Sequence, residues 1–101
     1  MILPLYALMA KDHRNGVEHR LSIRPEHLEH LESAGDKLVF AGALQTEAAQ
    51  PTGTLTVIEA PSLAEATAFF EKDPFVIRGV FQSYEISRWN WAVNNPEKRG
   101  Q

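Results

Sequence analysis

Two helix-start signals, one at Pro25 and one at Ser62, divide this chain into helical and extended segments. Proline fits the first turn of a helix, where its missing N–H costs no hydrogen bond. Ser62 and Glu65 have the spacing of a capping box, in which the serine hydroxyl accepts from the backbone N–H of the glutamate. Gly35 and Pro74 are typical helix ends. We therefore expect one helix between Pro25 and Gly35 and another between Ser62 and Pro74.

Four apolar segments have the length and patterning of β-strands, namely residues 1–10, 37–44, 54–60 and 80–89. The resulting order, βαββαβ, predicts a ferredoxin-like α+β fold with a four-stranded antiparallel sheet and two helices on one face. Apolar residues occupy both alternating sets of the strands, so the other face also needs a cover. A second copy of the sheet is the simplest cover, which predicts a homodimer with packed sheets.

The remaining segments are polar. Residues 11–20 contain Asn15 and Gly16, a strong turn signal. We expect a mobile loop here, with at most a partial helical turn near residues 17–22. Residues 92–101 are predicted to form a polar, loosely held C-terminal tail, which leaves residues 1–91 as the folded domain.

Composition narrows the classes of function. A chain of 101 residues is long enough for one domain, and its net charge of -3 argues against a nucleic-acid partner. Cysteine is absent, so disulfides and thiolate chemistry are excluded. The apolar opening run is too short to span a bilayer and lacks the basic start and cleavage pattern of a signal peptide. We expect a cytoplasmic protein without a membrane partner.

Two histidines lie three residues apart in the stretch RPEHLEHLES, residues 24–33. With Leu28 and Leu31 as the buried stripe, a helix places His27 about 70° from the centre of that stripe and His30 about 130° away. His27 is therefore predicted to lie at the edge of a cleft. His30 is predicted to face solvent.

The histidines could in principle serve a metal or a proton. A zinc site needs three or four ligands, and this HxxH pair has neither a thiolate nor the HExxH register beside it. We therefore expect no metal. Proton transfer needs only one histidine and a group that orients it, and Asp73 at the end of the second helix is a candidate. The spacing by itself favours a plainer alternative, in which Asp73 caps the following turn and His27 bonds a local carbonyl.

Arg20 and Arg24 flank the start of the first predicted helix. Two guanidinium groups there could bind a carboxylate or a phosphate, or could form a solvated patch that balances nearby glutamates. Ser22 could donate a hydrogen bond to a ligand, or could simply begin the helix.

Four stretches resemble the YciI-like, or YCII-related, family: RLSIRPEHLEHL (20–31), AGAL (41–44), SLAEA (62–66) and KDPFVIRGVF (72–81). The most specific segments are R-P-x-H-L and D-P-[FY]-x-x-x-G-[VL]-[FY]. The resemblance runs in order from about Tyr6 to Trp89. It implies a dimeric ferredoxin-like fold similar to muconolactone isomerase and related dimeric α/β-barrel proteins. Many members carry Gly-Pro after the second strand, where this chain has Gly42 and Ala43, so the wall of the pocket is expected to differ.

The resemblance also implies a cleft that holds a histidine and an aspartate, here His27 and Asp73. One relative of known activity is a dehydrochlorinase that acts on a chlorinated hydroxyhydroquinone. The leading hypothesis is a cofactor-free enzyme of the lyase or isomerase type, with His27 as general base or acid and Asp73 as its orienting partner.

The remaining site residues complete this hypothesis. Arg24, with Arg20, would hold an anionic or phenolic group of a small cyclic substrate. Tyr6 and Phe75 would form an apolar wall, and Ser22 would contact the ligand. The alternative is a non-catalytic dimer that binds a small ligand or has a regulatory role.

Overall fold

The sheet confirms the ferredoxin-like fold. The structure, a computed structural model, describes residues 2–101, so Met1, the first residue of the first predicted strand, lies outside the described residues. The strands are β1 (Leu5–Asp12), β2 (Leu38–Gln45), β3 (Pro51–Glu59) and β4 (Phe81–Trp89). They lie in the order β2-β3-β1-β4, and each adjacent pair is antiparallel. This order places β1 at the centre of the sheet and β2 at an edge.

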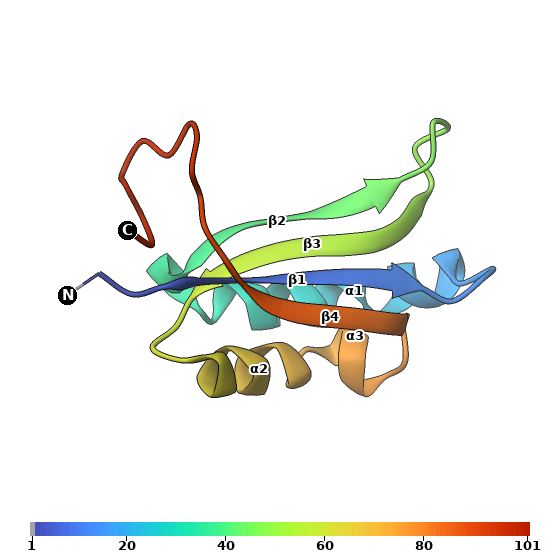
Figure 1. Cartoon of the computed structure of the whole chain (residues 1–101). Helices are drawn as coiled ribbons and strands as arrows, with labels where there is room; N and C mark the ends of the chain where they lie inside the picture. The colour runs from blue at the N-terminus through green and yellow to red at the C-terminus, as the bar shows by residue number, and fades with distance from the viewer. Residues whose placement is uncertain (1) are drawn as a thin grey trace.

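The helices cover one face of the sheet. They are α1 (Val17–Glu32), a single 3-10 turn η1 (Gly35–Lys37), α2 (Leu63–Glu71) and α3 (Pro74–Ile77). In Figure 1 α1 is seen behind β1, while α2 and α3 lie below it. α2 begins as predicted, because the Ser62 hydroxyl accepts a hydrogen bond from the backbone N–H of Glu65. α3 was not expected from the sequence. It follows α2 after a short turn and has Asp73 as its N-cap.

The expectation of a mobile loop over residues 11–20 was wrong. β1 continues to Asp12, and α1 begins at Val17, so only four residues form the turn. Pro25 consequently lies inside α1 rather than in its first turn. The carbonyl of Leu21 loses its helical donor there, but the Leu21 side chain is exposed, so water can reach that side of the helix.

The early start of α1 has a cause in packing. The buried residues of α1 are Arg20, Ile23, His27 and Leu31, a stripe at helical spacing that begins before the proline. A helix that started at Pro25 would leave the first two of these residues without a fixed position. Burial against the sheet therefore outweighs the local preference of proline for a helix start.

The two faces of the sheet are covered differently. Tyr6, Leu8 and Ala10 of β1 face the helices and belong to the main core. Leu5 and Ala7 face the other way and pack with Val57 and partly buried aromatic residues. We call this second side the outer face.

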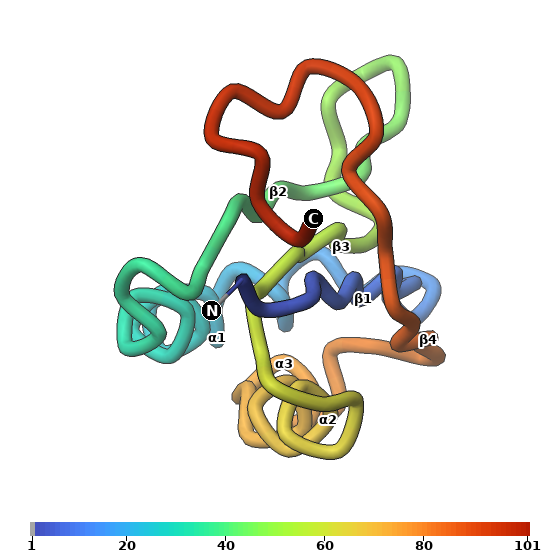
Figure 2. Tube along the Cα trace, turned by 60° about the vertical axis from the view of Figure 1, so that its left-hand side comes forward, coloured from blue at the N-terminus to red at the C-terminus, as the bar shows by residue number. Residues whose placement is uncertain are grey.

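The C-terminal segment covers one end of the outer face, as Figure 2 shows from a second angle. Gly100 packs directly against Leu5, and Arg99 donates hydrogen bonds to the Glu59 carboxylate and to the carbonyl oxygen of Asp36. The expectation of a loosely held tail was therefore wrong. Its polar composition hid these contacts, because they are made by one glycine and one arginine side chain.

Candidate functional site

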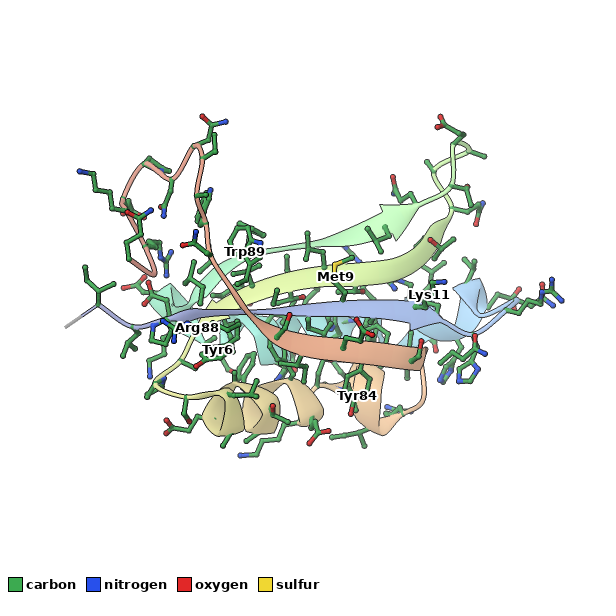
Figure 3. The ribbon with its side chains drawn as sticks, in the orientation of Figure 1. Tyr6, Met9, Lys11, Tyr84, Arg88 and Trp89 are labelled. Atoms are coloured by element: carbon green, nitrogen blue, oxygen red, sulfur yellow. The ribbon has the colours of Figure 1, made fainter. Side chains whose placement is uncertain are left out.

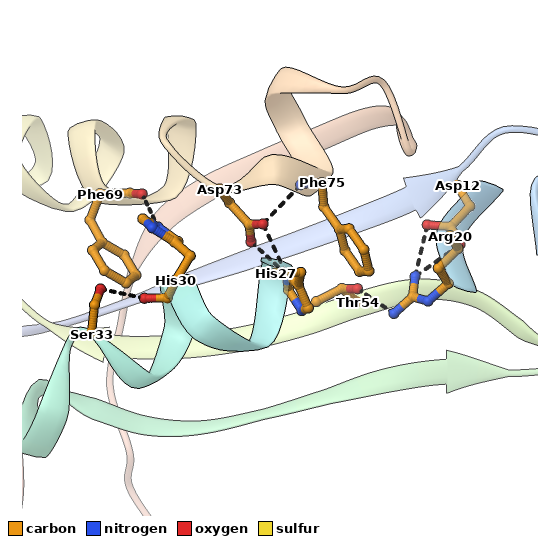
Figure 4. A network of polar contacts seen from close by, with 9 residues as sticks. All are labelled: Asp12, Arg20, His27, His30, Ser33, Thr54, Phe69, Asp73 and Phe75. Atoms are coloured by element: carbon orange, nitrogen blue, oxygen red, sulfur yellow. Dashed lines mark hydrogen bonds and ion pairs between the residues drawn. The ribbon is translucent and has the colours of Figure 1, made fainter. Parts of the chain in front are cut away.

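A buried histidine–aspartate pair forms the centre of the site. His27 on α1 and Asp73 before α3 are each only 5% exposed. His27 Nδ1 lies 2.9 Å from one Asp73 carboxylate oxygen and 2.8 Å from the other (Figure 4). Because a carboxylate accepts hydrogen bonds, Nδ1 carries the proton, and a neutral ring then has its lone pair at Nε2. His27 lies deeper than the predicted cleft edge, because the buried stripe of α1 is centred closer to it than to Leu28.

Asp73 reaches His27 because of its place in the chain. It is the N-cap of α3, and its Oδ1 accepts a hydrogen bond of 2.9 Å from the backbone N–H of Phe75. Pro74 occupies the first turn of α3, where proline is favoured. The capping role and the pairing with His27, which the sequence presented as alternatives, occur together. The cap holds the carboxylate in the position that the imidazole needs.

Phe75 fixes the plane of the imidazole. Its ring stacks on His27 with a centroid distance of 3.7 Å and an interplanar angle of 4°. The ring of Phe81 packs edge-on against the ring of Phe75, with a centroid distance of 5.6 Å. The hydrogen bond to Asp73 holds one atom of the imidazole, whereas the stacked ring holds its face.

A small cavity lies in front of the pair. Its volume is about 110 Å³, and it opens between α1 and the strands β2 and β3. The residues that line it are Arg20, Arg24, His27, Leu28, Leu31, Ala41, Gly42, Ala43, Thr54 and Phe75. No side-chain nitrogen or oxygen of residues 2–101 is both sealed from solvent and without a hydrogen bond. His27 Nε2, which has no partner in that range, therefore remains accessible to solvent.

The two arginines have different roles. Arg24 is exposed at the cavity and makes no ion pair with residues 2–101. Arg20 is 5% exposed, and its Nη1 donates to both Asp12 oxygens at 3.0 and 2.9 Å. Its Nη2 donates to the Thr54 hydroxyl at 2.9 Å. Arg24 is thus free to meet an anion, while most of the hydrogen-bonding capacity of Arg20 is used within the protein.

The structure does not bring Ser22 and Tyr6 to this cavity. Ser22 is exposed on α1 and donates to the carbonyl oxygen of His19. Tyr6 lies in the main core below β1 (Figure 3). Neither residue lines the cavity. Phe75 does form a wall of the cavity, as expected.

His30 was expected to face solvent, and this expectation was wrong. It is half-buried between α1 and α2, where its Nε2 donates to the carbonyl oxygen of Phe69 at 2.8 Å and its ring stacks on the Phe69 ring. The helical wheel omitted α2, whose packing against α1 covers this side. His30 therefore joins the two helices and takes no part in the cavity.

Asp12 and Thr54 were missed at this site by the sequence reasoning. A signal for Asp12 was present, because Tyr6, Leu8, Ala10 and Asp12 alternate along one strand and share the face toward the helices. Within residues 2–101, no group of three or more histidine and acidic side chains lies close enough to hold a metal ion. In the same range, no helix is long and apolar enough to cross a membrane.

Fold and site together define a class: a ferredoxin-like α+β domain with a buried histidine–aspartate pair at a cavity between helix and sheet. Residues 4–90 match the YCII-related domain. The chain therefore belongs to the YCII-related family.

Two relatives in sequence are the proteins called YciI of Escherichia coli O6:H1 and of Shigella flexneri. Each is 34% identical to this chain over 90 residues, which cover 81% of the chain and 92% of the relative.

Solved structures agree with the fold. One is the 5-chloro-2-hydroxyhydroquinone dehydrochlorinase TftG of Burkholderia phenoliruptrix AC1100 in complex with 2,5-dihydroxybenzoquinone. It is 29% identical, with a TM-score of 0.76, and the match covers 84% of this chain and 92% of that one. A NIPSNAP family protein of Agrobacterium tumefaciens is 19% identical, with a TM-score of 0.59 over 94% of this chain and 93% of that one. This second likeness concerns the fold alone.

Proposed function

We propose that this protein is an enzyme in which His27 transfers a proton to or from a small cyclic substrate that carries an acidic hydroxyl group. The observation that supports this most directly is the arrangement of the imidazole. Nδ1 is bound to a buried carboxylate, while Nε2 remains accessible at a cavity. This is the arrangement by which a carboxylate fixes the tautomer of a histidine that acts as a general base.

Arg24 would hold the substrate. Its guanidinium lies at the cavity, and a hydroxyl group that loses its proton to His27 becomes an oxyanion. A nearby guanidinium stabilises that negative charge. After the transfer, the imidazolium would be stabilised by Asp73.

Two observations favour a single ring as the substrate. The cavity of about 110 Å³ is small for a binding site, and its walls include Leu28, Leu31 and Phe75. The similar protein TftG is named for a dehydrochlorination of a hydroxyhydroquinone. Such a reaction removes one proton and one chloride ion from the substrate and needs no external oxidant. One histidine suffices for its acid–base steps, because the proton that it takes from the substrate can pass to water as chloride leaves the ring.

The proposal is tested with 5-chloro-2-hydroxyhydroquinone as substrate and chloride release as the measurement. The variant His27→Asn keeps an amide N–H near the position of Nδ1 but lacks Nε2. We expect it to fold and to lose turnover by at least a hundredfold, since general acid–base catalysis contributes about 10²–10⁴ in rate. The variant His30→Asn on the same helix is the matched control and should retain turnover. Full chloride release by His27→Asn would contradict the proposal.

A second candidate function is ligand binding without chemistry. The position of Arg24 at the cavity supports it, because a guanidinium can bind an anionic ligand without any proton transfer. In this case 2,5-dihydroxybenzoquinone would bind through Arg24, and no chloride would be released from the chlorinated compound. Binding without turnover in the unmodified protein therefore separates the two functions.

We further propose that the protein is a homodimer that packs outer face against outer face. The outer face is only partly covered by the C-terminal segment. Met9 on β1 and Leu44 on β2 remain 47% and 37% exposed. Exposed apolar side chains on a sheet face favour a partner of matching shape, and a second copy is the simplest one.

A further inference from the structure

Arg20 and Asp12 form a buried ion pair that takes no part in the proposed proton transfer. The Arg20 and Asp12 side chains are only 6% and 4% exposed. Removing two charged groups from water is costly unless their geometry is good and their remaining donors are bonded. Here one terminal nitrogen of the guanidinium donates to both carboxylate oxygens of Asp12, and the other donates to the hydroxyl of Thr54. Three hydrogen bonds therefore fix the guanidinium in place.

The fixed guanidinium lies against the ring that holds His27. Arg20 Cζ is 4.8 Å from the centroid of the Phe75 ring, within the range of a cation–π contact. The imidazole of His27 stacks on Phe75, and Figure 4 shows the phenyl ring between the two groups. A continuous series of contacts thus runs from Asp12 through Arg20 and Phe75 to His27.

The position of Asp12 in the sheet makes it a suitable start for this series of contacts. The pairing of β1 with β4 changes register between Lys11 and Asp12, and Asp12 is the last residue of β1. Such irregularities are frequent beside active sites. Asp12 still lies on the face of β1 that is turned toward the helices, where it binds Arg20 of α1. Asp12 is therefore carried by the central strand of the sheet, which is a rigid place to anchor Arg20.

We propose that Asp12 and Thr54 make Arg20 a positioning residue, which holds the Phe75 ring and thereby the plane of the His27 imidazole. This inference rests on the proposed function. Asp12 lies outside the cavity, and Arg20 and Thr54, which line it, act here through the Phe75 ring. Asp73 holds one nitrogen of the ring, and the Arg20–Phe75 contact limits the tilt of the ring about that hydrogen bond. The direction of Nε2 into the cavity is then set from two sides.

The test compares Arg20→Lys and Thr54→Val with the unmodified protein by NMR. Lysine keeps the charge but cannot bind Asp12 and Thr54 with a planar fork. Valine has the shape of threonine, and Thr54→Val removes only the hydrogen bond to Arg20. We therefore expect Thr54→Val to fold even if Arg20→Lys does not. In both folded variants we expect weaker dipolar contacts between the His27 and Phe75 rings and a changed resonance of the His27 Nδ1 proton. Thr54→Ser should restore both signals.

Arg78→Lys is the matched control. Arg78 also binds a carboxylate with two hydrogen bonds, to Glu26, and that pair also joins α3 to α1. The pair is exposed, unlike the buried pair of Arg20 and Asp12. This variant should leave the His27 signals unchanged, which separates the specific contact from a general loosening of α3.

Kinetics supply a second readout. If the ring is merely tilted, turnover of 5-chloro-2-hydroxyhydroquinone should fall about ten- to a hundredfold in Arg20→Lys. The affinity for 2,5-dihydroxybenzoquinone, which Arg24 provides, should change much less. Unchanged His27 and Phe75 signals in folded Arg20→Lys and Thr54→Val would overturn the inference. If the unmodified protein neither binds nor converts these compounds, the proposed function fails, and the NMR comparison still decides the positioning role.

Discussion

At the scale of single residues, Asp73 carries two tasks that are usually separate. One carboxylate caps α3 through the backbone N–H of Phe75 and also accepts from His27 Nδ1. Asp73 could be identified from the motif D-P-F in the sequence. That Asp73 has both tasks could not be predicted from the sequence, because this depends on how α3 packs beside α1.

The variant Asp73→Asn separates these tasks. Asparagine is as good an N-cap as aspartate, so α3 should remain. Its carboxamide is neutral, however, and its NH₂ group opposes the Nδ1 proton of His27, which favours the tautomer with the proton on Nε2. We expect turnover to fall by about 10²–10⁴, with a loss of unfolding free energy of about 1–2 kcal/mol. Chloride release and urea unfolding measure the two effects, and unimpaired turnover would count against an orienting role for Asp73.

At the scale of elements, the sequence predicted the types of strands and helices better than the start of α1. The capping box of α2 was correct because its two residues are close in the sequence. The helix start predicted at Pro25 was wrong, because the buried stripe that includes Arg20 and Ile23 extends α1 toward its N-terminus. α3 was missed because a helix of one turn has no periodicity to detect.

The contact between α2 and β4 gives a pH-dependent prediction. The Tyr84 hydroxyl donates to the Glu71 carboxylate at 2.6 Å, and this bond, aided by burial and by the negative charge, raises the pKa of Tyr84 above its ordinary value of 10.0. The folded state favours the neutral phenol. Its contribution to stability is therefore present in full below pH 10 and is lost as the pH rises through the raised pKa.

An ultraviolet titration of the phenol measures this shift. Glu71→Ala should return the ionisation of Tyr84 toward the ordinary value, and Tyr84→Phe identifies its share of the absorbance. Glu85→Ala, which removes a carboxylate from the residue next to Tyr84, serves as the control. The same midpoint for Tyr84 in the unmodified protein and in Glu71→Ala would show that the hydrogen bond has no such effect.

At the scale of the whole molecule, the sequence predicted a second covered face of the sheet. Apolar residues in both alternating sets of the strands were the signal, and Leu5 and Ala7 do pack on the outer face. The cover at one end is the C-terminal segment of the same chain. The sequence could not show this, since Arg99 and Glu59 are 40 positions apart in the chain.

The proposed dimer is tested by placing charge on the open part of the outer face. The double variant Met9→Glu/Leu44→Glu should dissociate the dimer into folded monomers, because buried carboxylates without partners are costly. Leu63→Glu changes a similarly exposed leucine on α2, on the other side of the sheet, and should leave the dimer intact. Analytical ultracentrifugation gives the mass of each form. A monomeric unmodified protein, or a dimer unaffected by the double variant, would contradict the proposed interface.

The central claim is that His27 presents Nε2 to a ligand at the cavity while His30 only joins two helices. The most direct measurement is an NMR titration of protein labelled with ¹⁵N-histidine, with 2,5-dihydroxybenzoquinone as the ligand. Both histidines appear in one spectrum, so His30 is an internal control. We predict a large change at His27 Nε2, a smaller one at its Nδ1, and none at His30. Saturable binding that leaves both His27 nitrogens unchanged, or that moves His30 instead, would contradict the account.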